Sequence, residues 1–327
     1  MTAGIYTSRH RPAGFNFERL VSVPRSGYIY PLRGTVILYI EQMKTKPSKL
    51  LKGHFDHLPR CIFWPNEISQ FIAEHRRKWG VSTVSIEEIL EILLRQKSVI
   101  RAEFTSNKYD TIIRYLRGKH STNELALSLQ RDSFLSHGTA LTTHGMASSE
   151  NILYVNREQS PKDRPGGITQ GGMRLAFRNK QRQSKYIFNH SAVKYMLLSG
   201  KHTDRAGVTR IKNLAGETVD VTDKERTLID VVVRPAYAGG IERVTDAYAK
   251  AADGIDVDHM IDLLQRLDHA YPYHQAIGFL LERAGRPSAD CQKFEALGKE
   301  FDFYLDYGMK RPAFNKKWRL YYPASLE

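Results

Sequence analysis

The stretch FLSHGTALTTHG, residues 134–145, gathers the side chains of nucleophilic catalysis into a short segment. A nucleophilic serine needs a strained, exposed turn, a base and an orienting carboxylate. Ser136 instead follows Leu135 at a point where a helix needs a cap, and small residues that can pack closely come after it. We therefore expect a capped helix and no catalytic residue. His137 and His144 alone are too few for zinc, which takes three or four protein ligands.

A second stretch, TDKERTLIDVVVRPAYAGG, begins at Thr222 and ends at Gly240, and it predicts a helix with a defined start and end. Thr222 followed by Glu225 fits a capping box, and the Arg-Pro and Gly-Gly pairs end the helix. Asp230 falls inside a segment that we expect to be buried. A buried carboxylate needs a partner, and Arg226, one turn earlier, is the nearest candidate in the sequence.

The chain of 327 residues is long enough for two domains, and its net charge of +14 is unevenly distributed. Lys and Arg outnumber Asp and Glu by 10 to 3 in residues 1–63 and by 13 to 5 in residues 151–220, whereas residues 221–327 carry 15 against 17. Basic blocks of this kind favour a polyanionic partner. We expect a cytoplasmic protein because the sequence has no signal peptide, no membrane span and two widely separated cysteines.

Two amphipathic helices are predicted from Pro65 and from Ser85, because apolar residues recur after each at helical spacing. Two segments rich in β-branched and aromatic residues follow, 99–104 and 109–116, with turn residues between them. Helices followed by a β-hairpin are typical of a winged helix-turn-helix. Residues 47–58 are the best candidate for its third helix, and which helix would read DNA stays open.

The fold class predicted is therefore α+β, with an N-terminal winged helix-turn-helix over residues 43–120 and a mixed, mainly helical domain over residues 121–327. Residues 1–42 are predicted to be an extension of poor order, either a segment upstream of the true start or a native basic arm. Six cations flank the elements of the winged domain and are the candidate DNA-binding residues: Arg76, Arg77, Lys78, Lys97, Arg101 and Lys108.

A basic stretch, RLAFRNKQRQSK, covers residues 174–185 and is a second candidate contact for DNA or RNA. On a continuous helix it places four cations on one side: Arg174, Arg178, Arg182 and Lys185. A solvated helix face is the alternative interpretation. We expect no metal ligand and no cofactor. Gly239-Gly240 followed by Asp256 and Asp258 has the residue types of the nucleotidyltransferase signature. A helical segment separates the glycines from the aspartates, and Asp256 is placed as a helix cap, so we do not interpret them as such a site.

The ordered set IRYLRGKHSTNELALSL, FLSHGTALTTHG, ILYVNREQS, VTDKERTLIDVVVRPAYAGG and YPYHQAIGFLLERAG resembles the AbiEi family, the antitoxins and autorepressors of type IV toxin–antitoxin systems. The likeness runs from about residue 62 to residue 285. It implies a winged domain that binds repeats upstream of its own operon, and a C-terminal domain that neutralises a nucleotidyltransferase-like toxin, often without stable binding. It carries over no catalytic residue.

Three functions follow from these observations. The first is an antitoxin and autorepressor that acts in phage defence, with operator DNA and a cognate toxin as partners and no contact with a membrane. The second is a DNA- or RNA-binding regulator of the same fold without a toxin. The third is an enzyme such as a nuclease or nucleotidyltransferase.

Overall fold

The computed structural model describes residues 48–55, 57–161, 167–213 and 215–327. The predicted extension over residues 1–42 lies outside the described residues. Helices and three β-sheets alternate along the chain, so the α+β class is confirmed. No helix in the described ranges is long and apolar enough to cross a membrane.

The segment up to residue 120 holds helical residues 48–55, two further helices and a three-stranded sheet. Its elements are α2 (Pro65–His75), α3 (Ile86–Arg95), β1 (Cys61–Phe63), β2 (Ile100–Phe104) and β3 (Ile112–Arg117). Pro65 occupies the first turn of α2, where its missing N–H is not needed. The Ser85 side chain caps α3 by accepting a hydrogen bond from the backbone N–H of Glu88 (3.1 Å).

The sheet of this segment has the order β1-β3-β2, and both pairs are antiparallel. Apolar side chains of the three helical segments form one core with Trp79 and Val81, and its members include Leu51, Ile72 and Leu93. The helices are therefore held by burial of their apolar stripes, as the spacing in the sequence predicted.

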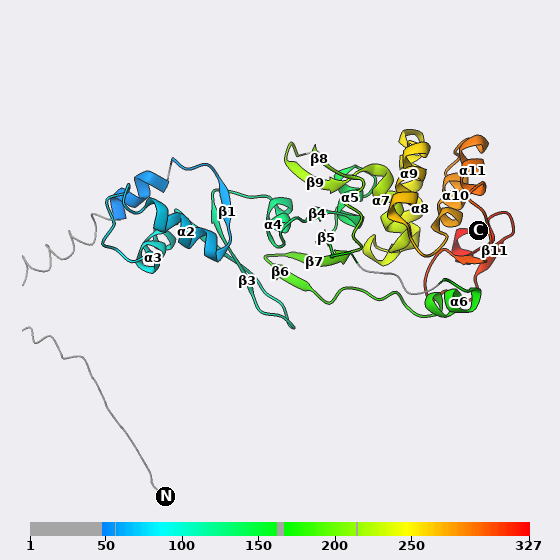
Figure 1. Cartoon of the computed structure of the whole chain (residues 1–327), viewed down its shortest axis with the longest axis horizontal. Helices are drawn as coiled ribbons and strands as arrows, with labels where there is room; N and C mark the ends of the chain where they lie inside the picture. The colour runs from blue at the N-terminus through cyan, green and yellow to red at the C-terminus, as the bar shows by residue number, and fades with distance from the viewer. Residues whose placement is uncertain (1–47, 56, 162–166, 214) are drawn as a thin grey trace, which may run out of the picture. The chain divides into compact units, whose positions relative to one another are not determined.

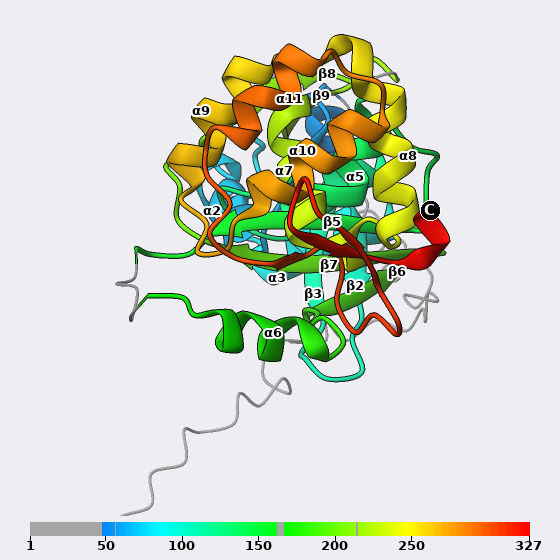
Figure 2. The same cartoon turned by 90° about the vertical axis from the view of Figure 1, so that its right-hand side faces the viewer.

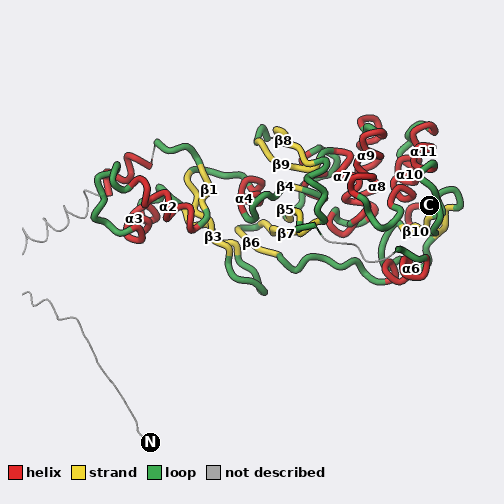
Figure 3. Tube along the Cα trace, viewed as in Figure 1, coloured by secondary structure: helices red, strands yellow, loops and turns green. Residues whose placement is uncertain are grey.

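A six-stranded mixed sheet follows, with the order β6-β7-β5-β4-β9-β8. Its strands are β4 (Phe134–Leu135), β5 (Ile152–Glu158), β6 (Ile187–His190), β7 (Val193–Gly200), β8 (Val208–Lys212) and β9 (Thr218–Thr222). Figures 1 and 3 show these strands between α4 (Thr122–Ser128) and the helices of the C-terminal part. The sequence pattern predicts a short strand over residues 153–156, and β5 confirms it.

The two faces of the sheet belong to two different cores because side chains alternate along each strand. Val155 and Leu197 pack with α4 and with Phe104 of the β2–β3 hairpin. Tyr154 and Leu198 point to the opposite face and pack against Tyr237.

Hairpin β2–β3 also joins the edge of the six-stranded sheet through its backbone. Thr105 and Asn189 exchange two backbone hydrogen bonds, of 2.9 and 2.7 Å. The Phe104 ring meets Tyr195 edge to face, with centroids 5.2 Å apart. An isolated β-bridge just after β2 thus binds the hairpin to strand β6, which comes about 80 residues later in the sequence.

Helices α7 to α11 and a small sheet form the remaining core. The helices are α7 (Lys224–Val233), α8 (Ile241–Ala251), α9 (Val257–Leu267), α10 (Tyr273–Arg283) and α11 (Ser288–Glu295), and the strands are β10 (Phe303–Tyr304), β11 (Ala313–Asn315) and β12 (Leu320–Tyr322). Figure 2 shows α6 (Gln170–Arg178) to one side of these helices, and its Phe177 is buried among aromatic rings of the C-terminal segment. The sequence pattern also predicts helices over residues 226–233, 241–252, 256–267 and 273–284, and α7 to α10 confirm them within two residues.

The predicted cap of α7 was wrong by one residue. Thr222 ends strand β9 and is fully buried, and its hydroxyl group bonds that of Thr227 (2.8 Å). Asp223 is the N-cap, and its carboxylate accepts a hydrogen bond from the Arg226 backbone N–H (2.7 Å). Both residue types cap helices well, and pairing of Thr222 in the sheet decides between them.

Candidate functional site

The turn from β4 into α5 (His137–Thr143) forms the centre of the candidate site. His137 has φ of +50°, a left-handed conformation that costs a non-glycine residue about 1–3 kcal/mol. A hydrogen bond of 2.8 Å joins its Nδ1 to Ser136 Oγ. Ser136 does occupy the N-cap position, but its side chain makes no cap hydrogen bond, so the expectation of a capping serine was wrong in this respect.

Strand β5 and the segment after α7 hold this turn from two sides. The Thr139 hydroxyl accepts a hydrogen bond from the Tyr154 backbone N–H (2.7 Å). A Cβ atom on Gly138 would lie 3.0 Å from the Tyr237 carbonyl oxygen and 3.1 Å from the Tyr154 ring. The small residues in this stretch therefore allow close packing, as the sequence indicated.

Helix α7 contributes a buried ion pair to the site. Arg226 Nε donates to Asp230 Oδ1 over 2.8 Å, and the two side chains are 6% and 8% exposed. The second guanidinium contact is with the Ala206 carbonyl oxygen (2.6 Å). The partner predicted for Asp230 from the sequence is confirmed.

His137 is neutral at ordinary pH. Burial lowers its pKa from 6.5 to about 4; the Asp230 carboxylate acts to raise this pKa, and the charges of Arg226 and Arg234 act to lower it. A neutral imidazole can donate from one ring nitrogen and accept at the other.

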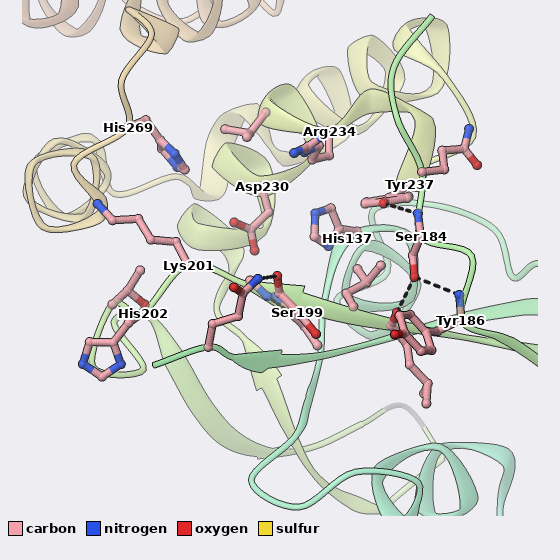
Figure 4. A pocket seen from close by; sticks show the side chains of 18 of the residues that line it. His137, Ser184, Tyr186, Ser199, Lys201, His202, Asp230, Arg234, Tyr237 and His269 are labelled. Atoms are coloured by element: carbon pink, nitrogen blue, oxygen red, sulfur yellow. Dashed lines mark hydrogen bonds between the residues drawn. The ribbon is translucent and has the colours of Figure 1, made fainter. Parts of the chain in front are cut away.

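A pocket with a volume of about 960 Å³ opens beside His137 and Asp230. Side chains from β5, β7, α7 and the segments around them line it, and Figure 4 shows His137, Asp230, Arg234 and Tyr237 around the same space. Tyr109, from the loop of hairpin β2–β3, and Tyr186, next to β6, form part of its wall. Its size is within the range of small-molecule sites, which is about 300–1,000 Å³.

The six candidate DNA-binding cations lie at three places. Arg76, Arg77 and Lys78 follow α2, at the start of the α2–α3 connection. Lys97 is in the turn between α3 and β2, and Lys108 is in the loop of the hairpin. Strand β2, with five residues and a length of roughly 16 Å, lies between these last two in the sequence.

Arg101 differs from the other candidates because it lies on β2 and forms an ion pair with Glu103 (3.0 Å) on the same strand. The remaining candidates are exposed, apart from Arg76, which is half-buried and reaches the Val84 carbonyl oxygen (3.5 Å). The structure thus spreads these cations along the segment.

The four cations of residues 174–185 do not share one helical side, so this prediction was wrong. Helix α6 ends at Arg178, and residues 180–186 have no helical structure. Arg174 and Arg178 line a second pocket, of about 680 Å³, beside Tyr304 and Tyr321. Lys185 lines the pocket of His137 instead.

One cluster could hold a metal ion in the described part of the chain. Ligand atoms of Asp223, Glu225 and His259 lie within 4.8 Å of one another. The protein uses these atoms itself: Asp223 caps α7 and bonds His259 Nε2 (3.0 Å), and Glu225 accepts from the Asp256 backbone N–H (2.9 Å). We interpret the cluster as a link between the starts of α7 and α9.

Sequence reasoning missed the pocket, although it named several of its residues. His137 was considered for catalysis, Asp230 and Arg226 for stability, and Lys185 for nucleic-acid contact. Tyr109, Tyr186 and Arg234 had no assigned role. A histidine after a strand, together with a buried Arg–Asp pair, could have indicated the pocket. The sequence does not show that they lie close together, because they are far apart along the chain.

No family model matches the chain, and no curated protein matches its sequence. Its fold is similar to a solved structure described as the crystal structure of RV2827C protein from Mycobacterium tuberculosis, with a TM-score of 0.54 and 14% sequence identity. The match covers 85% of this chain and 91% of that chain. A likeness at this level of identity concerns the fold alone.

Proposed function

We propose that this protein is an antitoxin and transcriptional autorepressor of a type IV toxin–antitoxin system. Residues 43–120 would bind operator DNA upstream of the protein's own operon as a winged helix-turn-helix, and residues 121–327 would neutralise a nucleotidyltransferase-like toxin in the cytoplasm. The observation that carries the DNA-binding part is the order of three helical segments and a hairpin, with exposed cations at the ends of these elements. The ordered resemblance to the AbiEi family carries the antitoxin part.

The charge on α3 restricts how this segment can meet DNA. Glu87, Glu88 and Glu91 are all exposed on this helix, and carboxylates repel phosphate groups. The phosphate contacts are therefore assigned to the cations at the ends of the helices, Arg76 to Lys78 and Lys97, and to Lys108 in the hairpin loop. Contacts from separate elements fix the register of a protein on the duplex.

Fluorescence anisotropy with labelled DNA from the region upstream of the gene tests this proposal. With about five phosphates neutralised, the logarithm of the affinity should fall against the logarithm of the salt concentration with a slope of about −4 to −5. The variant Arg76→Ala/Arg77→Ala should bind more weakly and with a shallower slope. Lys250→Ala, an exposed cation on α8, is the matched control and should leave binding unchanged. A flat salt response in the native protein would contradict DNA binding through charge.

A growth assay with the neighbouring reading frame tests the second part. If that frame encodes a nucleotidyltransferase-like toxin, co-expression of the full chain should restore growth. Arg76→Ala/Arg77→Ala should still restore growth while a reporter behind the operon's promoter is derepressed. If the variant loses repression but the neighbouring frame encodes no toxin, the result would favour a DNA- or RNA-binding regulator that has no toxin partner.

A further inference from the structure

The pocket beside His137 contains a carboxylate oxygen that the protein leaves unused. Asp230 is 6% exposed, and its Oδ1 accepts from Arg226. Its Oδ2 is buried and has no hydrogen-bond partner among the described residues. Figure 4 shows the Asp230 carboxylate pointing from α7 into the pocket. A buried acceptor without a partner is costly by about 1–3 kcal/mol, and a ligand N–H or O–H group would remove that cost.

The charge of the pocket favours an anion in spite of this carboxylate. Among the described residues that line it, Asp230 is the one acidic residue, against the cations Lys185, Lys201, Arg226 and Arg234. Lys201 is used by the protein, since it binds the Leu267 and Asp268 carbonyl oxygens (both 2.9 Å). Lys185 and Arg234 form no ion pair within the described ranges, so their charges are available to a ligand.

Tyr186 offers a flat apolar surface at the same pocket. One face of its ring stacks on Tyr109, with centroids 4.3 Å apart and an interplanar angle of 17°. The residue is still 51% exposed, so about half of its surface stays accessible. An open aromatic face beside a lysine is the usual platform for a nucleobase, because every base has a π-face that stacks well.

We propose that this pocket binds a nucleotide, either free or as the terminal residue of an RNA strand. The base stacks on Tyr186, the phosphate group is bound by Lys185 and Arg234, and a sugar hydroxyl or a base amino group donates to Asp230 Oδ2. Neutral His137 supplies a further polar contact deep in the pocket. This site is distinct from the proposed phosphate contacts at α2 and α3, although Tyr109 of its wall comes from the hairpin loop that carries Lys108. The proposal does not rest on the proposed binding of operator DNA.

Isothermal titration calorimetry with the full chain tests the proposal, using the four nucleoside monophosphates and triphosphates and a short single-stranded RNA. At least one of these should bind in a one-to-one ratio. Adenosine or the matching nucleoside, which lacks the phosphate, and inorganic pyrophosphate, which lacks the base, should each bind at least tenfold more weakly. Tighter binding of the RNA than of every mononucleotide identifies a strand terminus as the source of the ligand, and the reverse identifies a free nucleotide.

Variants place the ligand in this pocket. Tyr186→Ala and Lys185→Ala should each weaken binding about tenfold, since a base–aromatic stack contributes about 1–3 kcal/mol. The matched controls are Phe314→Ala, an exposed ring that also packs on a tyrosine, and Lys194→Ala, an exposed lysine on β7. Both should bind as the native protein does.

Asp230→Asn tests the deep contact, after its unfolding curve has shown that the variant is folded. It should weaken binding of the ligand more than it weakens binding of pyrophosphate. The proposal is overturned if no nucleotide or RNA binds, if pyrophosphate binds as tightly as the nucleotide, or if the Tyr186 and Lys185 variants bind as the controls do.

Discussion

Replacing Asp230 by alanine should lower the free energy of unfolding by about 3–5 kcal/mol. The pair that it forms with Arg226 is 2.8 Å long, and both side chains are more than nine-tenths buried. Without the carboxylate, the guanidinium group stays buried with the Ala206 carbonyl oxygen (2.6 Å) and a long contact to Thr203 (3.4 Å). An uncompensated buried charge accounts for most of the expected loss.

Two further variants separate the charge from the hydrogen bond. Asp230→Asn keeps the volume and an acceptor for Arg226 Nε but leaves the guanidinium group without a counter-charge. It should therefore be destabilised by about 1.5–3 kcal/mol less than Asp230→Ala, which is the contribution of a hydrogen bond to a charged group. The double variant Arg226→Met/Asp230→Leu removes both charges together. Its loss should be several kcal/mol smaller than the sum of Arg226→Met and Asp230→Leu, because a matched apolar pair leaves no charge buried.

Urea unfolding followed by tryptophan fluorescence measures these differences, since Trp318 is fully buried in the C-terminal core. The dependence of the unfolding free energy on urea should be the same for all variants, which shows that the comparison concerns stability. A loss below about 1 kcal/mol for Asp230→Ala at an unchanged slope would refute the view that this pair is buried and coupled.

Three other changes have defined outcomes. His137 has a folded pKa of about 4, so it stays uncharged in the native state, whereas in the unfolded chain it is protonated below about pH 6.5. The free energy of unfolding should therefore fall by up to about 3 kcal/mol as the pH drops from 6.5 to 4. Unfolding curves at several pH values check this, and the variant His137→Gln should show a weaker dependence on pH. Gly278→Ala would place a Cβ atom 2.2 Å from the Trp318 ring and should lower the unfolding free energy by about 3 kcal/mol in thermal scans, whereas Gly171→Ala on α6, with nothing within 4 Å, should be neutral or stabilising. Glu91→Lys on the exposed face of α3 should raise affinity for non-specific DNA in the anisotropy assay if this face lies near the duplex, and no change would place α3 away from the phosphates.

The long helices could be predicted because their apolar residues recur at helical spacing and their ends carry strong signals. The helix at residues 226–233 and the pairing of Arg226 with Asp230 both follow from this local pattern, since residues four apart lie on one face. The cap was misplaced by one position because Thr222 and Asp223 are both good caps. Only the pairing of Thr222 with Val208 in the sheet decides between them.

The basic stretch at residues 174–185 shows the opposite case. Its spacing fits a helix throughout, yet α6 ends at Arg178. Residues 180–186 instead run extended between α6 and β6, where Ser184 donates to the Leu197 carbonyl oxygen (2.7 Å) and receives a hydrogen bond from the Tyr186 backbone N–H (3.2 Å). Tertiary contacts of this kind override helical spacing, and a single sequence does not display them.

Most of the six-stranded sheet, and the pocket, were missed for a related reason. Strand β4 has two residues, and β6 has four, so neither shows a period that could be recognised. The pocket combines Tyr109, His137, Tyr186 and Asp230, which lie up to about 120 residues apart in the sequence. Each looked unremarkable in its own segment, and proximity alone makes them a candidate site.

The β2–β3 hairpin connects the pocket with the segment proposed to bind DNA. Strand β2 begins three residues after Lys97, the loop with Tyr109 joins β2 to β3, and backbone hydrogen bonds link Thr105 to Asn189 in β6. The hairpin loop supplies Tyr109, which stacks on Tyr186 in the wall of the pocket. A ligand that stacks on Tyr186 would therefore bind beside the hairpin. If the hairpin changes position when DNA binds, the affinities for DNA and for the pocket ligand must change each other by the same factor, because coupling between two sites is reciprocal. A rigid hairpin would give two independent sites, so the size of that factor measures the free energy with which the hairpin couples them.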